Sequence, residues 1–175
     1  MYRMQVLIIM LLLSAGVVEA GEPEVMTGPE ILAPFKRDLQ QALLNGLAQG
    51  PEEAVAVCKL KAPEIADALS LNGVRLGRTS NRLRNPSNIG PEWVAPILES
   101  YVNNPSDREP RTVSVSNNRS GYVEPIILQP VCLSCHGSSL SPEVSSRITE
   151  AYPEDHATGY QVGDLRGVFW VEFPD

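Results

Sequence analysis

The 175-residue sequence contains few of the side chains that usually bind metals and cofactors. It has three cysteines, two histidines and four methionines, and three of the methionines fall within the first ten residues. Acidic residues outnumber basic ones, and the formal net charge of −7 argues against nucleic acid as a partner. No Ser/His/Asp set and no phosphate-binding loop is recognisable. Inferences about function therefore depend on the few cysteines and histidines.

Long hydrophobic runs are also scarce, since one such run begins the chain and no second one follows. Arg3 precedes it, and small residues before Ala20 fit a signal peptidase site. A membrane anchor is the alternative, but the apolar segment is shorter than the roughly 20 residues that cross a bilayer. We therefore predict a signal peptide at residues 1–20, a linker at residues 21–30 and a periplasmic or secreted domain at residues 31–175, without a membrane span after cleavage.

Hydrophobic periodicity predicts helices in the first half of the chain and mostly strands in the second. Apolar residues recur every four positions from Ile31 to Leu47, Pro51 can open a second helix, and Pro63 should break it. Later patterns predict a strand at 74–79, a helix at 92–102, a hairpin of strands at 112–116 and 122–128, a helix at 142–152 and a strand at 164–173. This order is typical of an α+β domain with an antiparallel sheet and helices on one face.

The segment Cys132-Leu133-Ser134-Cys135-His136 directly follows the predicted hairpin. A C-x-x-C pair is typical of thioredoxin-like redox sites, but those follow a strand of a βαβ unit, which the pattern does not predict. Zinc requires four ligands, and Cys58 and His156 would have to complete the set at no familiar spacing. A plain disulfide with an incidental histidine is a third alternative.

C-x-x-C-H is also the signature of c-type haem attachment, and that interpretation accounts for all three side chains. Two cysteines three positions apart can add to the two vinyl groups on one edge of the porphyrin. The next residue then lies under the ring, where its imidazole can bind the iron. We therefore predict one haem c per chain, with Cys132 and Cys135 attached covalently and His136 as an axial iron ligand.

The motif does not decide the second axial ligand. Methionine is frequent at this position in cytochromes c, but Met26 lies in the predicted linker. His156 lies in a polar turn, and the nearby lysines at 59 and 61 are strongly solvated side chains. Cys58 is left over as an odd cysteine in an exported protein, and it is either a ligand or a buried unreactive thiol.

Four separated blocks of sequence, in a fixed order, resemble a known family. They are AVAVC with APEIA at residues 54–66, VRLGRTS with RNPSN at residues 74–88, the C-x-x-C-H motif, and YP followed by ATGY and GDLRG at residues 152–167. These blocks are similar to the exported haem c domain with a PAS-like fold first described in a cyanobacterial photosystem II-associated protein. The resemblance covers roughly residues 30–174.

The resemblance implies a PAS-like antiparallel sheet and a Cys/His axial pair on the iron. The family's cysteine ligand falls in the block that contains Cys58, so the resemblance assigns this role to Cys58 and leaves His156 on the surface. Arg78 lies in the second block and is expected to contact a haem propionate, because arginine makes paired charge-assisted bonds to carboxylates. In a strand at residues 74–79, Arg75 and Arg78 point to opposite faces, so only one of them can face the haem.

Three functional classes follow from a haem with two protein ligands. These are redox or ligand sensing, one-electron transfer, and a haem enzyme such as a peroxidase. A peroxidase needs an open distal site with acid/base groups, and Cys58 would fill that site, so we expect no enzyme. A structural C-x-x-C or zinc protein is the other alternative. The sequence does not separate sensing from electron transfer, and either requires a redox or signalling protein partner that it does not name.

Overall fold

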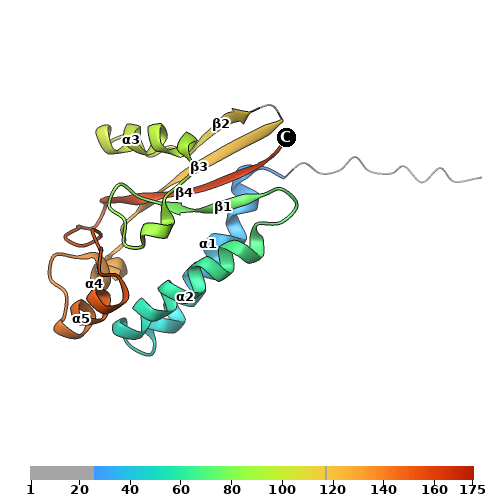
Figure 1. Cartoon of the computed structure of the whole chain (residues 1–175). Helices are drawn as coiled ribbons and strands as arrows, with labels where there is room; N and C mark the ends of the chain where they lie inside the picture. The colour runs from blue at the N-terminus through green and yellow to red at the C-terminus, as the bar shows by residue number, and fades with distance from the viewer. Residues whose placement is uncertain (1–25, 117) are drawn as a thin grey trace, which may run out of the picture.

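The computed structural model describes residues 26–116 and 118–175 (Figure 1). The predicted signal peptide, residues 21–25 of the predicted linker and one residue of the predicted hairpin turn lie outside these ranges. In chain order, the elements are α1 (Gly28–Leu47), α2 (Pro51–Leu69), β1 (Arg75–Thr79), η1 (Pro86–Asn88), η2 (Glu92–Val94), α3 (Ala95–Asn103), β2 (Arg111–Ser116), β3 (Arg119–Ile127), η3 (Pro130–Cys132), α4 (Leu133–His136), α5 (Pro142–Ala151) and β4 (Leu165–Pro174).

The four strands form one antiparallel sheet in the order β1-β4-β3-β2. The predicted hairpin is confirmed, since β2 pairs with β3 and Thr112 lies opposite Tyr122. The last strand, β4, lies between β1 and β3 and pairs with both. The predicted α+β class with an antiparallel sheet and N-terminal helices packed on it is therefore confirmed.

Helix α1 covers one face of the sheet together with α2. It begins at Gly28, ahead of the predicted start at residue 31, because the backbone N–H of Thr27 donates to the Glu30 carboxylate at 2.8 Å and caps the first turn. A Cβ atom at Gly28 would lie 2.3 Å from Cβ of Tyr122, so the helix start approaches the sheet closely there. The core on this face comprises Ile31, Leu32, Phe35, Leu39, Ala62, Leu76, Tyr122, Val171 and Phe173.

Helix α2 runs unbroken through Pro63, so the predicted break at this proline is wrong. Proline removes one intrahelical hydrogen bond and destabilises a helix interior by about 3 kcal/mol. Tertiary packing on both sides of Pro63 offsets this cost, because Ala62 is buried in the core and Ile65 and Leu69 pack against it. Local propensity is here overridden by burial of the helix face.

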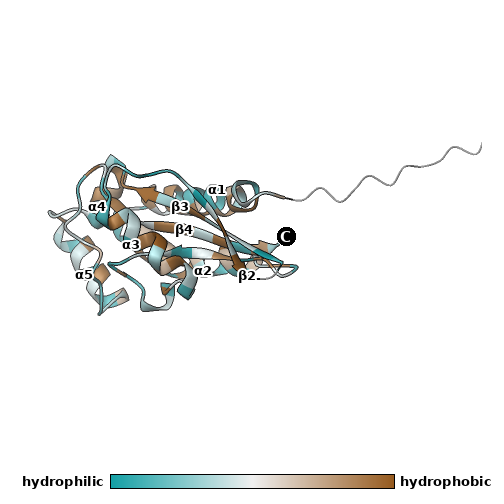
Figure 2. Ribbon diagram, turned by 90° about the horizontal axis from the view of Figure 1, so that it is seen from above, coloured by the Kyte–Doolittle hydropathy of each residue, from teal (hydrophilic) through white to brown (hydrophobic). Residues whose placement is uncertain are grey.

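The opposite face of the sheet is covered by α3, so the helices do not all lie on one face as predicted (Figures 1 and 2). Strand β4 explains the difference. Phe169 and Val171 face α1 and α2, whereas Val168 and Trp170 face the other way. A central strand that is hydrophobic on both faces must be covered on both. On this second face, η2 contributes Val94, and α3 contributes Ile97, Leu98 and Tyr101.

Helices α4 and α5 lie together at one end of the molecule (Figure 1). Val144 and Ile148 of α5 pack with Val55 of α2 and with Tyr152 in a separate small core. This packing places the C-x-x-C-H turn beside α2 and the adjacent end of the sheet. Within the described part of the chain, no helix combines the length and apolar character that crossing a bilayer requires.

Candidate functional site

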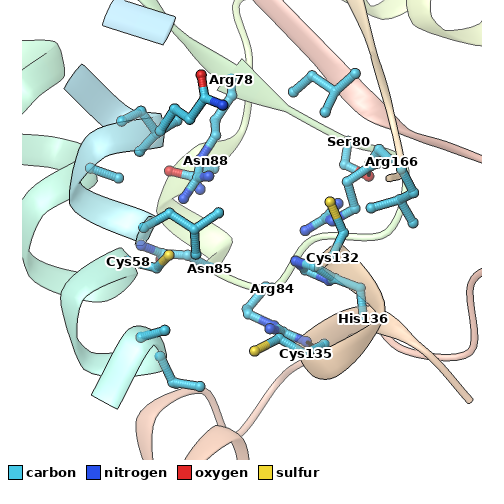
Figure 3. A pocket seen from close by; sticks show the side chains of 18 of the residues that line it. Cys58, Arg78, Ser80, Arg84, Asn85, Asn88, Cys132, Cys135, His136 and Arg166 are labelled. Carbon is cyan, nitrogen blue, oxygen red and sulfur yellow. Dashed lines mark hydrogen bonds between the residues drawn. The ribbon is translucent and has the colours of Figure 1, made fainter. Parts of the chain in front are cut away.

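The C-x-x-C-H motif folds as a short helical turn that leaves the sheet after β3. Pro130 opens η3 with its fixed φ, Cys132 ends this element, and α4 carries Cys135 and His136. Residues three and four positions apart in a helical turn lie on the same side. Figure 3 accordingly shows Cys132, Cys135 and His136 grouped at one side of a pocket.

This pocket is a cavity of about 410 Å³ between α1, α2, the sheet and the C-x-x-C-H turn. Its size falls in the range of about 300–1,000 Å³ that is usual for small-molecule and cofactor sites. The cavity brings together all five residues that the sequence indicated, namely Cys58, Arg78, Cys132, Cys135 and His136. Much of the remaining wall is apolar and includes Leu39, Leu43, Leu47, Ile126, Leu128 and Phe169.

Cys58 lies on α2, across the cavity from His136 (Figure 3). It shares one helix face with the buried Val55 and Ala62, three positions before it and four positions after it. The ring of Tyr152 packs against the same stretch of α2, with Lys59 Nζ 5.7 Å from its centre. Burial and the neighbouring Cys58 raise the pKa of Tyr152, so its hydroxyl keeps its proton.

His136 is held from behind by the backbone of Ala157. Its Nδ1 lies 2.7 Å from the Ala157 carbonyl oxygen, so Nδ1–H is the donor and Nε2 is the nitrogen with a free lone pair. The ring of Tyr160 meets the imidazole edge-on at 6.4 Å. Burial, with the nearby charges of Arg84 and Arg166, lowers the pKa of His136 to about 3 and keeps the ring neutral.

The loop at residues 155–160 also holds the backbone of the C-x-x-C-H turn. Gly159 N donates to Gly137 O at 2.9 Å, and Tyr160 N donates to His136 O at 3.0 Å. The side chain of Arg84 donates to the Cys135 carbonyl at 2.7 Å. The second, third and fourth sequence blocks therefore meet at this turn.

Two guanidinium groups of the cavity wall, Arg78 and Arg166, have no carboxylate partner among the described residues. Arg75, in contrast, lies 3.7 Å from the Glu172 carboxylate on the other side of β1, as alternation along a strand requires. Burial lowers the pKa of Arg166 to about 10, so it remains charged at neutral pH. The cavity therefore carries positive charge inside an acidic protein.

A β-bulge in β4 explains why Arg166 faces the cavity. Ile127 pairs with Leu165 and Ile126 with Gly167, so Arg166 is an extra residue in the ladder. Strict alternation would put Arg166 on the same face of the sheet as Val168. Because of the bulge, Leu165 lies on that face instead and packs against the α3 core. The bulge thus turns a charged side chain into the cavity.

Family comparison identifies the chain. A model of the Tll0287-like family matches residues 17–174. The chain belongs to the Tll0287-like family. Among solved structures, it is similar to the crystal structure of the cyanobacterial heme-protein Tll0287, with 25% identity over 82% of this chain and 92% of that chain and a TM-score of 0.61. No curated protein matches the chain significantly. The family match confirms the resemblance drawn from the four sequence blocks.

The alternatives to the haem interpretation find little support in this Tll0287-like fold. The three cysteines are unpaired. The strands form an antiparallel sheet, so no βαβ unit precedes the C-x-x-C pair. Among residues 26–116 and 118–175, no three His, Cys, Asp or Glu side chains are grouped to hold a bare metal ion. His156 is exposed and does not line the cavity, as expected from its polar turn.

Three residues at the site of this Tll0287-like chain were not indicated by the sequence. Arg166 was not singled out because a bulge is invisible to periodicity, although GDLRG belongs to a family block. Asp155 and Ala157 lie beside and within the fourth block, and they act through hydrogen bonds that no spacing rule reveals.

Burial raises the pKa of the Cys135 thiol in this structure, so that thiol is neutral.

Proposed function

We propose that this chain is a periplasmic protein that binds one haem c covalently and acts in redox or ligand sensing or in one-electron transfer, and that it is not an enzyme. The proposal rests on one arrangement. Cys132, Cys135 and His136 lie on one wall of a single cavity, and Cys58 lies on the facing wall. The family of the chain and the similarity to a cyanobacterial heme-protein support it further.

The residues present fit a haem in charge and polarity as well as in position. A porphyrin is a flat apolar ring with two anionic propionates. The apolar wall suits the ring, and the guanidiniums of Arg78 and Arg166 suit the propionates, because arginine makes charge-assisted bonds to carboxylates. Without an anion in the cavity, these two partly buried guanidiniums would have no carboxylate partner among the described residues.

In this proposal each side chain has a distinct role. Cys132 and Cys135 would hold the haem through their sulfurs, and His136 Nε2 and the Cys58 sulfur would bind its iron from the two facing walls of the cavity. The haem iron supplies one-electron chemistry and, where an axial bond is weak, a site for small ligands. The Nδ1–H bond to Ala157 fixes the imidazole orientation, as partners behind metal-binding histidines commonly do.

The composition of the cavity wall supports a non-enzymatic role. Among the described residues that line the cavity, there is no carboxylate and no histidine except His136. A peroxidase-like reaction needs a free acid/base group near the iron. With His136 and Cys58 both assigned to the iron, no carboxylate and no imidazole of the described lining residues is left for proton transfer.

Expression with the haem c attachment machinery tests the proposal. The purified protein should keep its haem after denaturation and give a c-type pyridine haemochrome spectrum with one haem per chain. The Cys132→Ala/Cys135→Ala variant should lose covalent haem, whereas His156→Ala, an exposed control, should not. Haem that is extracted from the wild-type protein by acidified organic solvent would refute the proposal.

A second measurement separates the two roles. A ligand sensor should bind CO or NO once reduced, with a change in its absorption spectrum. An electron carrier should keep both axial ligands in both oxidation states and exchange electrons rapidly without binding either gas.

A further inference from the structure

A buried ion pair joins two loops beside the C-x-x-C-H turn. The side chains of Arg84 and Asp155 are only 11% and 9% exposed. Nε and Nη2 of Arg84 lie 3.1 and 3.2 Å from the two carboxylate oxygens of Asp155, so the pair is bidentate. Burying two charges is unfavourable unless further hydrogen bonds satisfy their remaining donors and acceptors.

The other side-chain hydrogen bonds of Arg84 and Asp155 go to the backbone of Cys135 and Ala157, the residues beside and behind His136. Arg84 Nη2 donates to the carbonyls of Cys135 at 2.7 Å and of Ala157 at 3.3 Å. Asp155 Oδ1 accepts from the backbone N–H of Ala157 at 2.9 Å. Ala157 is fully buried, and its carbonyl is the group that accepts from Nδ1 of His136. The ion pair therefore holds the N–H of Ala157 through one partner and its carbonyl through the other.

We propose that Arg84 and Asp155 are positioning residues for His136, a role that rests on the proposed function. Together they fix the Ala157 backbone so that its carbonyl holds Nδ1 and Nε2 faces the cavity. Asp155 also neutralises Arg84 next to His136, the proposed iron ligand. Among the described residues, Asp155 is the only carboxylate bonded to an arginine of the cavity wall, since Arg78 and Arg166 have none.

The charge balance gives the proposal a signature that simple loss of structure does not produce. Asp155→Asn leaves a positive charge beside the iron, which favours the reduced form and raises the reduction potential. Arg84→Gln leaves a negative charge and lowers it. We expect each single variant to change the equilibrium constant for reduction on the order of tenfold, about 59 mV for one electron. The double variant restores neutrality and should return close to the wild-type potential.

The positioning role has a separate readout in the ferric protein. Asp155→Asn replaces the oxygen that accepts from Arg84 Nη2 by an NH2 group, which cannot accept, so the bidentate pair that holds the Ala157 backbone is lost and the imidazole orientation becomes less uniform. The low-spin electron paramagnetic resonance signal should therefore broaden or split in this variant, while the haem stays covalently attached. In the double variant the signal should remain broadened although the potential recovers, because neither charged partner is there to hold Ala157.

The exposed pair Arg147 and Glu150 on α5 supplies a matched control, and Glu150→Gln should change neither the potential nor the signal. The single variants can fail to accumulate, because each leaves one buried charge uncompensated. The double variant then tests the inference, since balanced charges should restore a folded haem protein. Shifts of the same sign in both single variants, an unchanged resonance signal in Asp155→Asn, or failure of the double variant as well would overturn the inference. The wild-type haem assay tests the proposed function independently, so the two failures are distinguishable.

Discussion

Replacement of Arg166 by methionine should have opposite effects on the haem-free and haem-containing protein. Burial lowers the pKa of Arg166 from its ordinary value to about 10, which corresponds to roughly 3 kcal/mol, because one pKa unit equals about 1.4 kcal/mol. This lowered pKa means that folding disfavours the charged form. The penalty is complete below about pH 10 and disappears only as the pH rises towards the ordinary pKa of arginine, so it applies fully at pH 7.

Two favourable contacts of Arg166 reduce the expected gain. Its Nη1 donates to the Arg82 carbonyl at 3.1 Å, and its guanidinium lies 5.7 Å from the centre of the Tyr160 ring. Their loss should offset about 1–2 kcal/mol. We therefore expect Arg166→Met to raise the free energy of unfolding of the haem-free chain by about 1–2 kcal/mol. With haem present, the same change removes a charge-assisted bond to a propionate and should lower it by about 1–3 kcal/mol.

Urea unfolding at pH 7 measures both effects. The haem-free chain can be made without the signal peptide, in a compartment where no haem is attached. A change of 1–2 kcal/mol should move the midpoint by about 0.5–1 M urea. Arg75→Met is the control, because Arg75 is exposed on the other face of β1, and its effect should be the same in both forms. A shift of equal sign and size in both forms of Arg166→Met would refute an anion at this position.

Three other predictions concern Cys58, the sheet and the N-terminus of the exported protein. Cys58→Ala should keep the covalent haem but open the iron to added imidazole or CO, and an unchanged absorption spectrum would show that Cys58 is only a core thiol. Gly167→Ala should destabilise the sheet by more than about 1 kcal/mol in urea unfolding, because φ is +154° there and the added Cβ would lie 2.1 Å from the Thr79 carbonyl oxygen. N-terminal sequencing of the exported protein should find a mature chain that begins near Gly21, and a retained Met1 would favour the membrane-anchor alternative.

The elements with strong periodicity were predictable from the sequence. The four-residue repeat of α1, the hairpin of β2 and β3 and the start of α2 at Pro51 all depend on local pattern and turn chemistry. The unbroken helix at Pro63 was not predictable, because its stability comes from the core that Ile65 and Leu69 meet. The position of α3 on the second face of the sheet was not predictable either, because it depends on which strand becomes central.

Some residues of the site were likewise predictable from the sequence, and others were not. Covalent motif chemistry indicated Cys132, Cys135 and His136, and alternation along β1 correctly separated Arg78 from Arg75. The odd cysteine made Cys58 a candidate, but only the family resemblance assigned it to the iron, because a helix face does not reveal what stands opposite it. The Arg84–Asp155 pair joins residues 71 positions apart, and such contacts follow from tertiary structure alone.

The central place of β4 has a consequence for how the protein folds. Within residues 26–116 and 118–175, strand β1 pairs only with β4, which follows it by about 90 residues, so these pairs close a very long loop. Contacts of this kind form late and slow the folding of a domain. If the chain is exported from its N-terminus, as we propose, Cys132 and Cys135 emerge before β4 and therefore before β1 can pair. The proposed haem attachment would then compete in time with sheet closure, and a chain shortened before Leu165 should keep its cysteines accessible to the attachment machinery without forming the cavity.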